Sequence, residues 1–347
     1  MNASNSVHLE HLVNGQTRSS RLLVILGLVL ALALQFSPRA NAQNNVNCAA
    51  PVTSAPTGPA IVSAASTSYG QVLVEGSEGY SGCSLYVLTS DEIHTLTSGA
   101  EPFGCSDSQN VLEASCDAVL WPALLTDGAP IAGPGVNPKL LGTVTRTDVL
   151  SGLSVQQVTY AGLPLYRFFL DGTPGATGGA NLFDPVTSPA GIWYLVEPSR
   201  GLPAPGQARL ELETAPVNGT GSDQTVLAVS MDNDFSVFPN ASFPVYTLSA
   251  QLRSPWDQGI ACRGICAAVP WPPVLTSKQP EAGPGIDQRD LGTIVRPDGT
   301  QQVTYKGEPV YLFYRDAYIL GITGTQGIYG ESESTPWGVF NTVSPSP

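Results

Sequence analysis

The sequence predicts a mainly β protein made of two tandem homologous repeat domains with short strands and Gly/Pro turns. One observation is a repeated pentapeptide, because Gln156–Tyr160 and Gln301–Tyr305 both read Gln-Gln-Val-Thr-Tyr. A second is that 36 glycines and 30 prolines divide the 347-residue chain into short runs rich in β-branched and aromatic residues, which favour strands. Long helical periodicity is missing from residue 43 onward.

The repeat extends over most of the chain. Identical residues recur at an offset of 150 positions, in the pairs Cys116/Cys266, Trp121/Trp271, Gly133/Gly283 and Gly142/Gly292. Downstream the offset shrinks by a few residues, in the pairs Gln157/Gln302, Asp171/Asp316 and Trp193/Trp337. A colinear series of this kind indicates duplication of a unit of roughly 120–150 residues.

This duplication and the composition divide the chain into five segments: a signal peptide, a flexible lead-in, a first β-repeat domain, a linker and a second β-repeat domain. Their predicted bounds are 1–42, 43–68, 69–198, 199–224 and 225–347. The lead-in is rich in Ala, Ser, Thr and Pro, which favour flexible chain. The two copies either fold as separate domains of ordinary size or pack as one pseudo-twofold unit.

An export signal is predicted at the start of the chain. Arg18 and Arg21 precede an apolar run over residues 22–34, and residues 40–42 read Ala-Asn-Ala, an A-x-A cleavage pattern. The run is shorter than the roughly 20 residues that span a bilayer, so we expect cleavage and no stable membrane span. An uncleaved anchor is the alternative. The mature chain is then secreted or extracytoplasmic.

Short runs bounded by turn residues predict the strands. They cover residues 71–74, 85–88, 157–160, 165–170, 192–196, 225–229, 302–305 and 310–314. Hairpins are expected around 161–164 and 306–309, where Gly and Pro separate paired runs. A helical turn is expected near Cys116 and near Cys266.

Six cysteines follow the predicted signal peptide: Cys48, Cys83, Cys105, Cys116, Cys262 and Cys266. An even count in an exported chain indicates disulfides, although six cysteines allow 15 pairings. The repeat aligns Cys116 with Cys266, and each has one cysteine upstream of it. It therefore predicts three bonds, Cys48–Cys83, Cys105–Cys116 and Cys262–Cys266.

The Cys262-x-x-x-Cys266 spacing has more than one interpretation. It is one residue longer than the Cys-x-x-Cys of oxidoreductases, so a structural disulfide is favoured over redox chemistry. A zinc site needs about four Cys/His ligands, and His94 is the one histidine left after cleavage. We therefore expect no metal site and no cofactor.

Charge and side-chain chemistry restrict the function classes. The net charge of −13 disfavours nucleic acid and anionic lipid as partners. Triad and Cys-His catalysis need a histidine base, and His94 lies in a stretch without a counterpart in the second copy. Two acids suffice for glycoside hydrolysis, but no pair stands out. We assign no catalytic residue and favour a non-enzymatic role, while enzymatic activity stays open. Glycosylation sequons begin at Asn218 and Asn240.

A Tyr-x-Phe-x-x-Asp element recurs in both copies, and Tyr86-x-Leu88-x-x-Asp91 is a related element. The candidate ligand residues are Tyr166, Asp171, Tyr311, Tyr314 and Asp316. One interpretation is that the aromatic rings pack in the core and that each Asp caps a turn. The other is a ligand platform, in which an aromatic ring stacks on a sugar and the Asp accepts a hydroxyl.

Three motifs together resemble a known family. They are the Tyr-x-Phe-x-x-Asp element, the cysteine segment followed by Trp-Pro, and Gln-Val-Thr-Tyr-x-Gly-x-Pro-[Leu/Val]-Tyr. They resemble the bacterial secreted-repeat proteins, also described as predicted lipoproteins with a Tyr-x-(Phe/Trp/Tyr)-x-x-Asp motif, over roughly 69–198 and 225–343. The resemblance implies export and β-rich repeats, and it implies no reaction. No lipobox precedes Cys48, so a lipid anchor is not expected.

We therefore expect an exported, disulfide-stapled repeat protein that acts as a non-enzymatic surface or extracellular interaction module. Its partner would be a surface or matrix ligand, with glycans among the candidates. Two alternatives stay open. One is a carbohydrate-binding module or weak glycoside-processing enzyme, and the other is an envelope redox partner.

Overall fold

A computed structural model describes the chain in ten stretches. They are residues 46–100, 103–106, 115–150, 152–184, 187, 190–217, 222–230, 242–249, 260–318 and 328–344. Asn44–Pro347 form one compact unit. The predicted signal peptide and the two sequon asparagines, Asn218 and Asn240, lie outside the described residues. Within the described ranges, no helix is long and apolar enough to cross a bilayer.

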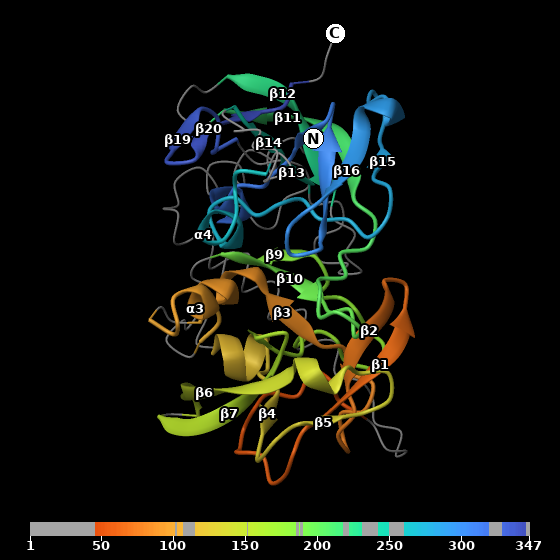
Figure 1. The fold of residues 1–347 in the computed structure, drawn as a ribbon, viewed down its shortest axis with the longest axis vertical. Helices are drawn as coiled ribbons and strands as arrows, with labels where there is room; N and C mark the ends of the chain where they lie inside the picture. Colours follow the sequence, from red (N-terminus) through yellow and green to blue (C-terminus); the bar gives the residue numbers. More distant parts are fainter. Residues whose placement is uncertain are drawn as a thin grey trace, which may run out of the picture. The chain divides into compact units, whose positions relative to one another are not determined.

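The first copy contains three small sheets, with strand orders β2-β1-β5, β3-β10-β9 and β4-β7-β6, and β8 pairs with β7. Its strands are β1 (Ile61–Thr67), β2 (Gly70–Glu75), β3 (Tyr86–Leu88), β4 (Leu125–Thr126), β5 (Ile131–Ala132), β6 (Leu141–Leu150), β7 (Leu153–Tyr160), β8 (Leu163–Pro164), β9 (Leu182–Asp184) and β10 (Gly191–Leu195). The antiparallel β6–β7 hairpin is the longest pairing of this copy (Figure 1).

The second copy repeats this plan, with strand orders β13-β12-β11-β15, β14-β20-β19 and β16-β17-β18. Its strands are β11 (Arg209–Pro216), β12 (Asp223–Ser230), β13 (Ser242–Pro244), β14 (Tyr246–Leu248), β15 (Glu281–Ala282), β16 (Leu291–Val295), β17 (Gln301–Tyr305), β18 (Glu308–Pro309), β19 (Glu333–Thr335) and β20 (Gly338–Thr342). The fold is mainly β, as the sequence predicts.

Helices in the described part are short. They are η1 (Thr89–Asp91), α3 (Glu92–Leu96), η2 (Cys116–Leu120), η3 (Pro138–Leu140), α4 (Ile265–Ala268), η4 (Gln288–Asp290) and η5 (Tyr314–Tyr318). The helical turns expected near Cys116 and Cys266 correspond to η2 and α4.

Both predicted hairpins are present, and their turns explain the residues that they use. Ala161 and Gly162 have φ of 50° and 89°, and Lys306 and Gly307 have φ of 50° and 83°. Two successive residues with positive φ match a type I′ turn, whose twist suits an antiparallel hairpin. Glycine adopts this φ without strain, which accounts for its place in both turns.

The strands expected at 165–170 and 310–314 are wrong. Tyr166 and Tyr311 form only isolated bridges there. The reason is that successive amides bond to different segments: Leu165 N donates to Val158 O, Tyr166 N to Tyr86 O, and Arg167 N to Pro122 O. A chain whose partners change at each residue cannot form a ladder with one neighbour.

Two strands lie in stretches expected to be irregular. β1 lies within the expected lead-in, and this stretch forms a strand because six of its residues pair with β2. β11 lies within the expected linker, and this stretch forms a strand because all eight of its residues pair with β12. The division into two domains stays a prediction.

A shared core joins the copies. One hydrophobic cluster contains Phe183 of the first copy and Phe243 of the second, whose ring centroids are 5.3 Å apart. Each copy also has a cluster of its own, around Trp121 and around Trp271. The copies therefore cannot be separated without exposing buried apolar surface.

The chain enters both copies in the same way. Asp127 N donates to Gly58 O, and Ser277 N donates to Gly206 O in the equivalent bond. The residues before β1 thus contact the first copy. The residues before β11, at the end of the first copy, contact the second copy in the same way. We call residues 46–60 the N-terminal segment. The N-terminal segment packs on the first copy at a position equivalent to the one at which the end of the first copy packs on the second copy.

Candidate functional site

The two acids of the Tyr-x-Phe-x-x-Asp element are bonded inside their own copies. Tyr86 OH donates to Asp171 Oδ2 at 2.5 Å, and Asp171 Oδ1 accepts from Gly178 N at 2.8 Å. In the second copy, Tyr246 OH donates to Asp316 Oδ2 at 2.8 Å. Burial raises the pKa of Asp316 to about 8, against hydrogen bonds that lower it. A protonated or tyrosine-bonded carboxyl of this kind stabilises the core.

A second tyrosine–acid pair crosses the first. Tyr166 OH donates to Asp91 Oδ2 at 2.8 Å, and Asp91 Oδ1 accepts from Gly104 N at 2.7 Å. The tyrosine of each motif in the first copy is therefore bonded to the acid of the other motif.

The candidate ligand residues are enclosed. Tyr166 and Tyr311 are 0% exposed, Asp171 2% and Asp316 5%, while Tyr314 is half-buried. The structure distributes them between the two copies and does not gather them on one surface. This placement fits the packing interpretation, and their ligand role stays untested.

A buried arginine in each copy was missed by the motif search. Arg146 Nη1 donates to Gln157 Oε1 at 2.8 Å, and its Nη2 forms an ion pair with Asp117 at 2.7 Å. Arg296 Nη1 donates in the same way to Gln302 Oε1 at 2.6 Å. Arg146 and Arg296 are equivalent positions of the two copies, because they differ by 150 positions as Gly142 and Gly292 do. The sequence repeat therefore contains the pattern that could have identified these arginines.

The cysteines form three disulfides, Cys48–Cys83, Cys105–Cys116 and Cys262–Cys266, the pairs expected from the repeat. Trp121 and Trp271 pack in the same clusters as the second and third of these bonds. Cys262 and Cys266 are fully buried. Thiol–disulfide exchange requires access to a sulfur, so this burial gives a redox role no support.

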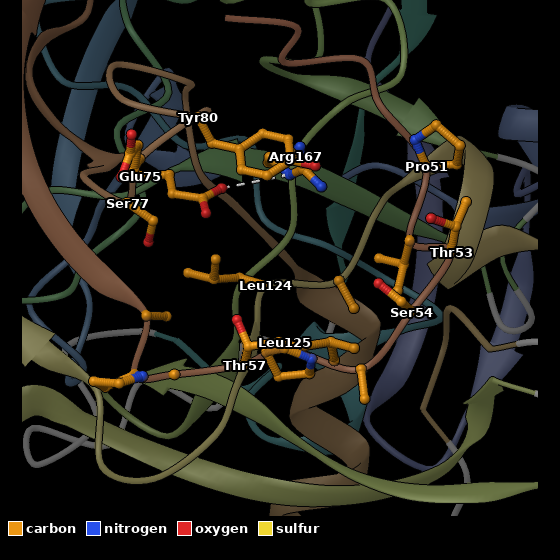
Figure 2. A pocket seen from close by; sticks show the side chains of 18 residues that line it. Pro51, Thr53, Ser54, Thr57, Glu75, Ser77, Tyr80, Leu124, Leu125 and Arg167 are labelled. Atoms are coloured by element: carbon orange, nitrogen blue, oxygen red, sulfur yellow. Dashed lines mark ion pairs between the residues drawn. The ribbon is translucent and has the colours of Figure 1, made fainter.

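A cavity of about 410 Å³ opens on the first copy. Its walls are formed by the N-terminal segment, the end of β2 and the residues after it, residues 123–125, and Arg167 of the aromatic motif. The labelled members are Pro51, Thr53, Ser54, Thr57, Glu75, Ser77, Tyr80, Leu124, Leu125 and Arg167 (Figure 2). Carboxyl, guanidinium and hydroxyl groups thus share one small space with prolines and leucines.

Glu75, Glu78 and Arg167 are the charged residues that line this cavity, and Glu75 and Arg167 form an ion pair. Glu75 Oε2 lies 3.5 Å from Arg167 Nε (Figure 2), and the two residues are 5% and 4% exposed. Neither of these two atoms has a hydrogen-bond partner among the described residues. Burial raises the pKa of Glu75 to about 7, although Arg167 and Ser77 lower it.

Other contacts hold Arg167 in place. Its guanidinium carbon lies 4.0 Å from the centre of the Tyr80 ring, an attractive cation–π contact. Its Nη1 donates to Cys48 O at 3.4 Å, which ties the arginine to the N-terminal segment. The cavity is therefore preorganised by the Cys48–Cys83 disulfide and by Tyr80.

Comparison with known proteins identifies part of the chain. Residues 292–325 match the family described as "Secreted repeat of unknown function". This stretch is one copy of the secreted repeat. It contains Arg296, Gln302, Tyr311 and Asp316, the buried polar residues of the second copy. No curated protein and no solved structure shows a significant match to the chain.

The strand register corrects one pair in the alignment of the two copies. Trp193 pairs with Leu88 and stacks on Trp121 at 3.7 Å, whereas Phe340 pairs with Leu248 and stacks on Trp271 at 3.7 Å. Phe340, and not Trp337, is therefore the counterpart of Trp193. Matching tryptophans gave the wrong pair because the position requires an aromatic ring and not an indole.

Strand register also shows that, among the described residues, the charged pair of the first copy has apolar counterparts in the second copy. Val62 faces Glu75 in the β1–β2 pair, as Leu210 faces Val229 in the β11–β12 pair. Arg167 follows Tyr166 as Leu312 follows Tyr311. Val229 and Leu312 are 0% and 1% exposed in the shared core. The repeat fold therefore accepts apolar side chains where the first copy has an ion pair.

The difference follows from what covers each copy. Phe243 of the second copy packs against Phe183 of the first. Cys83, its counterpart in the first copy, is bonded instead to Cys48 of the N-terminal segment. The N-terminal segment is shorter than a whole copy and fills less space, and the cavity lies between this segment and the first copy.

Proposed function

We propose that this protein is an exported, disulfide-stapled, non-catalytic binding module, and that the cavity over Glu75 and Arg167 is its ligand site. Its secreted-repeat family and its disulfides are consistent with an extracytoplasmic location. The single observation that carries the proposal is the Glu75–Arg167 pair, which lines a cavity at positions where the second copy has Val229 and Leu312.

The energetics of buried charge support a ligand role. Desolvating two charges is costly, and replacing a buried ion pair by apolar residues is often neutral or stabilising. The second copy provides that replacement within the same chain. The fold does not require the pair, and Glu75 Oε2 and Arg167 Nε are buried without hydrogen bonds to offset the cost of their desolvation, which favours a role for the pair outside folding.

One observation favours catalysis as the second candidate. Glu75, whose burial raises its pKa to about 7, shares the cavity with Glu78. Glycoside hydrolysis uses two carboxyl groups, one of which acts as an acid with a raised pKa. Analysis of the ligand after incubation separates the candidates, because a binding module returns it unchanged.

The proposal is tested with the double variant Glu75→Val/Arg167→Leu, which we call the cavity variant. It gives the first copy the residues of the second. Thermal unfolding is measured with neutral saccharides, amino acids, carboxylates and amines as probes. Since a ligand that binds only the folded state raises Tm, we expect one probe class to raise the Tm of the wild type and not that of the cavity variant.

The matched control is Arg209→Leu/Glu281→Val, the surface-pair variant. It removes an exposed ion pair by the same two chemical changes. It should respond to the probes as the wild type does. A wild type that responds to no probe class, or a cavity variant that responds equally, contradicts the proposed function.

A further inference from the structure

We infer that a cleft between the two copies is a second binding site, which takes an uncharged, extended peptide segment. The cleft has a volume of about 480 Å³, within the range of small-molecule sites, and lies inside the compact unit Asn44–Pro347. Its walls come from the start of β2, the stretch 197–205, residues 275–277 and the β16–β17 hairpin. The inference goes beyond the proposed function, because no residue of this cleft lines the cavity over Glu75 and Arg167.

β16 has a free edge beside the cleft. It pairs with β17 on one side and is the terminal strand of its sheet. Gln301 O accepts from Thr276 N, so the main-chain groups of Gln301 and of its partner Val295 point away from each other. Val295 also lines the cleft. Among the described residues its N–H and C=O therefore have no hydrogen-bond partner, and an added strand would supply one.

β2 has the same property at Gln71. Leu73 N donates to Val196 O and Leu73 O accepts from Leu85 N, so the main-chain groups of Leu73 point away from β1. Those of Gln71, two residues earlier, point the same way, because the direction alternates along an antiparallel strand. Gln71 lines the cleft, and within the described ranges its main chain has no partner on that edge. Two strand edges thus offer main-chain donors and acceptors to one cleft.

β16 lacks the features that usually protect an exposed edge, which are charged residues, proline and bulges. Leu291–Val295 contains neither a charged residue nor a proline, and it keeps one register with β17. Its counterpart β6 shifts register between Arg146 and Leu150. An unprotected edge is an aggregation hazard, so its presence in the second copy favours a partner that covers it.

The charges of the cleft favour an uncharged partner segment. Its charged lining residues are Glu197 and Arg200, which are partly exposed and pair with each other at 2.8 Å. The lining therefore has no unpaired charge to compensate a charged side chain that loses water there. The formal net charge of −13 also opposes the close approach of a second copy of this chain.

Two wall positions are less polar than their counterparts in the first copy. Val295 and Thr145 occupy the same position in the β16–β17 and β6–β7 hairpins. Ser277 and Asp127 are equivalent as well, because their amides donate in the same way to the residues before β11 and β1. The second copy has thus replaced a hydroxyl by an exposed apolar side chain and a carboxylate by a hydroxyl, which suits a partner of low charge.

The remaining wall chemistry suits a peptide. The exposed amide of Gln301 has both a donor and an acceptor, as a peptide group does. Leu202, Pro203 and Val295, which is 52% exposed, provide apolar contacts for the side chains of the segment. Main-chain hydrogen bonds give affinity in strand addition, and neighbouring pockets select the side chains.

Isothermal titration calorimetry on the full chain with its disulfides intact tests the inference, with acetyl-Gly-Thr-Val-Thr-Gly-amide as the probe. Val295→Pro is the test variant, because proline removes the outward N–H and leaves the bonds between β16 and β17 in place. Thr145→Pro is the matched control, the same change at the equivalent position of β6. We expect the wild type and Thr145→Pro to bind equally, and Val295→Pro to bind at least about tenfold more weakly.

Two peptide analogues test main-chain recognition without changing the protein. One is N-methylated at both threonines and the other at the valine. Neighbouring N–H groups of an extended peptide point to opposite sides, so one analogue should bind at least about tenfold more weakly and the other as the parent does. Peptides with lysine or glutamate in place of both threonines should bind more weakly than the parent.

The outcomes keep the two proposals apart. The cavity variant should bind the peptide as the wild type does, so a failure at one site leaves the other standing. If the parent peptide does not bind the wild type, if Val295→Pro binds it as well as the wild type does, or if both N-methyl analogues bind as the parent does, the inference is wrong. A wild type that dimerises in sedimentation velocity while Val295→Pro does not would show that the partner is a second copy and not a peptide.

Discussion

Each acid of the aromatic–acid motifs in the first copy is bonded to the tyrosine of the other motif. Tyr86 bonds Asp171, and Tyr166 bonds Asp91. These reciprocal bonds give the reused acids a packing role, since a buried carboxyl needs a hydrogen-bond partner. Sequence reasoning found the motif but could not find the crossing, because it depends on which segments meet in space.

The residues of the cavity escaped the sequence search for a different reason. Arg167 lies inside the aromatic motif, between Tyr166 and Phe168, in a stretch that the sequence predicts to be a strand. A search for shared residues discards positions at which the copies differ. The informative signal was the difference itself, Glu75 against Val229 and Arg167 against Leu312.

Titration of Glu75 predicts a specific pH dependence of stability. In the folded state the pKa of Glu75 is about 7, above the usual value of 4.5, so the folded state binds this proton more tightly than the unfolded state. The contribution of Glu75 to the free energy of unfolding is therefore fully present below about pH 4.5 and is lost as pH rises through 7. The facing groups are Arg167 and Ser77, and Glu78 and Tyr80 line the same cavity.

Glu75→Gln isolates this effect, because every other titrating group is common to both proteins. The free energy of unfolding of the wild type, relative to Glu75→Gln, should fall by about 3 kcal/mol between pH 4.5 and pH 8. Urea unfolding at a series of pH values measures it. Curves that stay parallel over this window would show that Glu75 is ionised without cost in the folded state.

At the scale of elements, the sequence correctly predicts features that depend on neighbouring residues, such as turns. The Gly-containing turns at 161–162 and 306–307 form the expected hairpins, because the two turn residues decide the geometry. The segments after them were wrong as strands, because their amides bond to several distant segments. The counterpart of Trp193 was wrong as well, because strand register sets it.

The N-terminal segment is the element on which the cavity depends. The Cys48–Cys83 bond closes a loop with a sequence separation of 35, and the Cys262–Cys266 bond one of 4. On a chain-entropy account, removing the first costs about 4 kcal/mol and removing the second about 2 kcal/mol.

We therefore expect Cys48→Ser/Cys83→Ser to lose more stability than Cys262→Ser/Cys266→Ser, and to lose ligand binding, which the second variant retains. Urea unfolding and calorimetric titration measure the two effects. Equal binding by both variants would mean that the N-terminal segment is not a wall of the site.

At the scale of the whole molecule, the two copies share one core and are covered in sequence. The N-terminal segment covers the first copy, and the first copy covers the second through Phe183 and Phe243. The end of the second copy is different, because β19 has Glu333, Ser334 and Thr335 where β9 has Leu182, Phe183 and Asp184. Polar outer faces at the ends are a general feature of repeat arrays.

The shared core predicts that the copies unfold together. Differential scanning calorimetry should show one transition for residues 44–347, and Phe183→Ala should move that transition to lower temperature as a whole. A buried Phe→Ala change costs about 3–5 kcal/mol. Two transitions, of which Phe183→Ala moves only one, would mean that the copies are energetically independent.

The buried residues that the two copies share build the fold, and we propose that function lies where the copies differ. Affinity for the probe class that raises the Tm of the wild type, measured by calorimetric titration on the cavity variant and on Asp171→Asn, tests this most directly. We predict that the cavity variant stays folded and loses binding, while Asp171→Asn is less stable and binds, when folded, as the wild type does. Binding that survives in the cavity variant and is lost in Asp171→Asn would contradict the account.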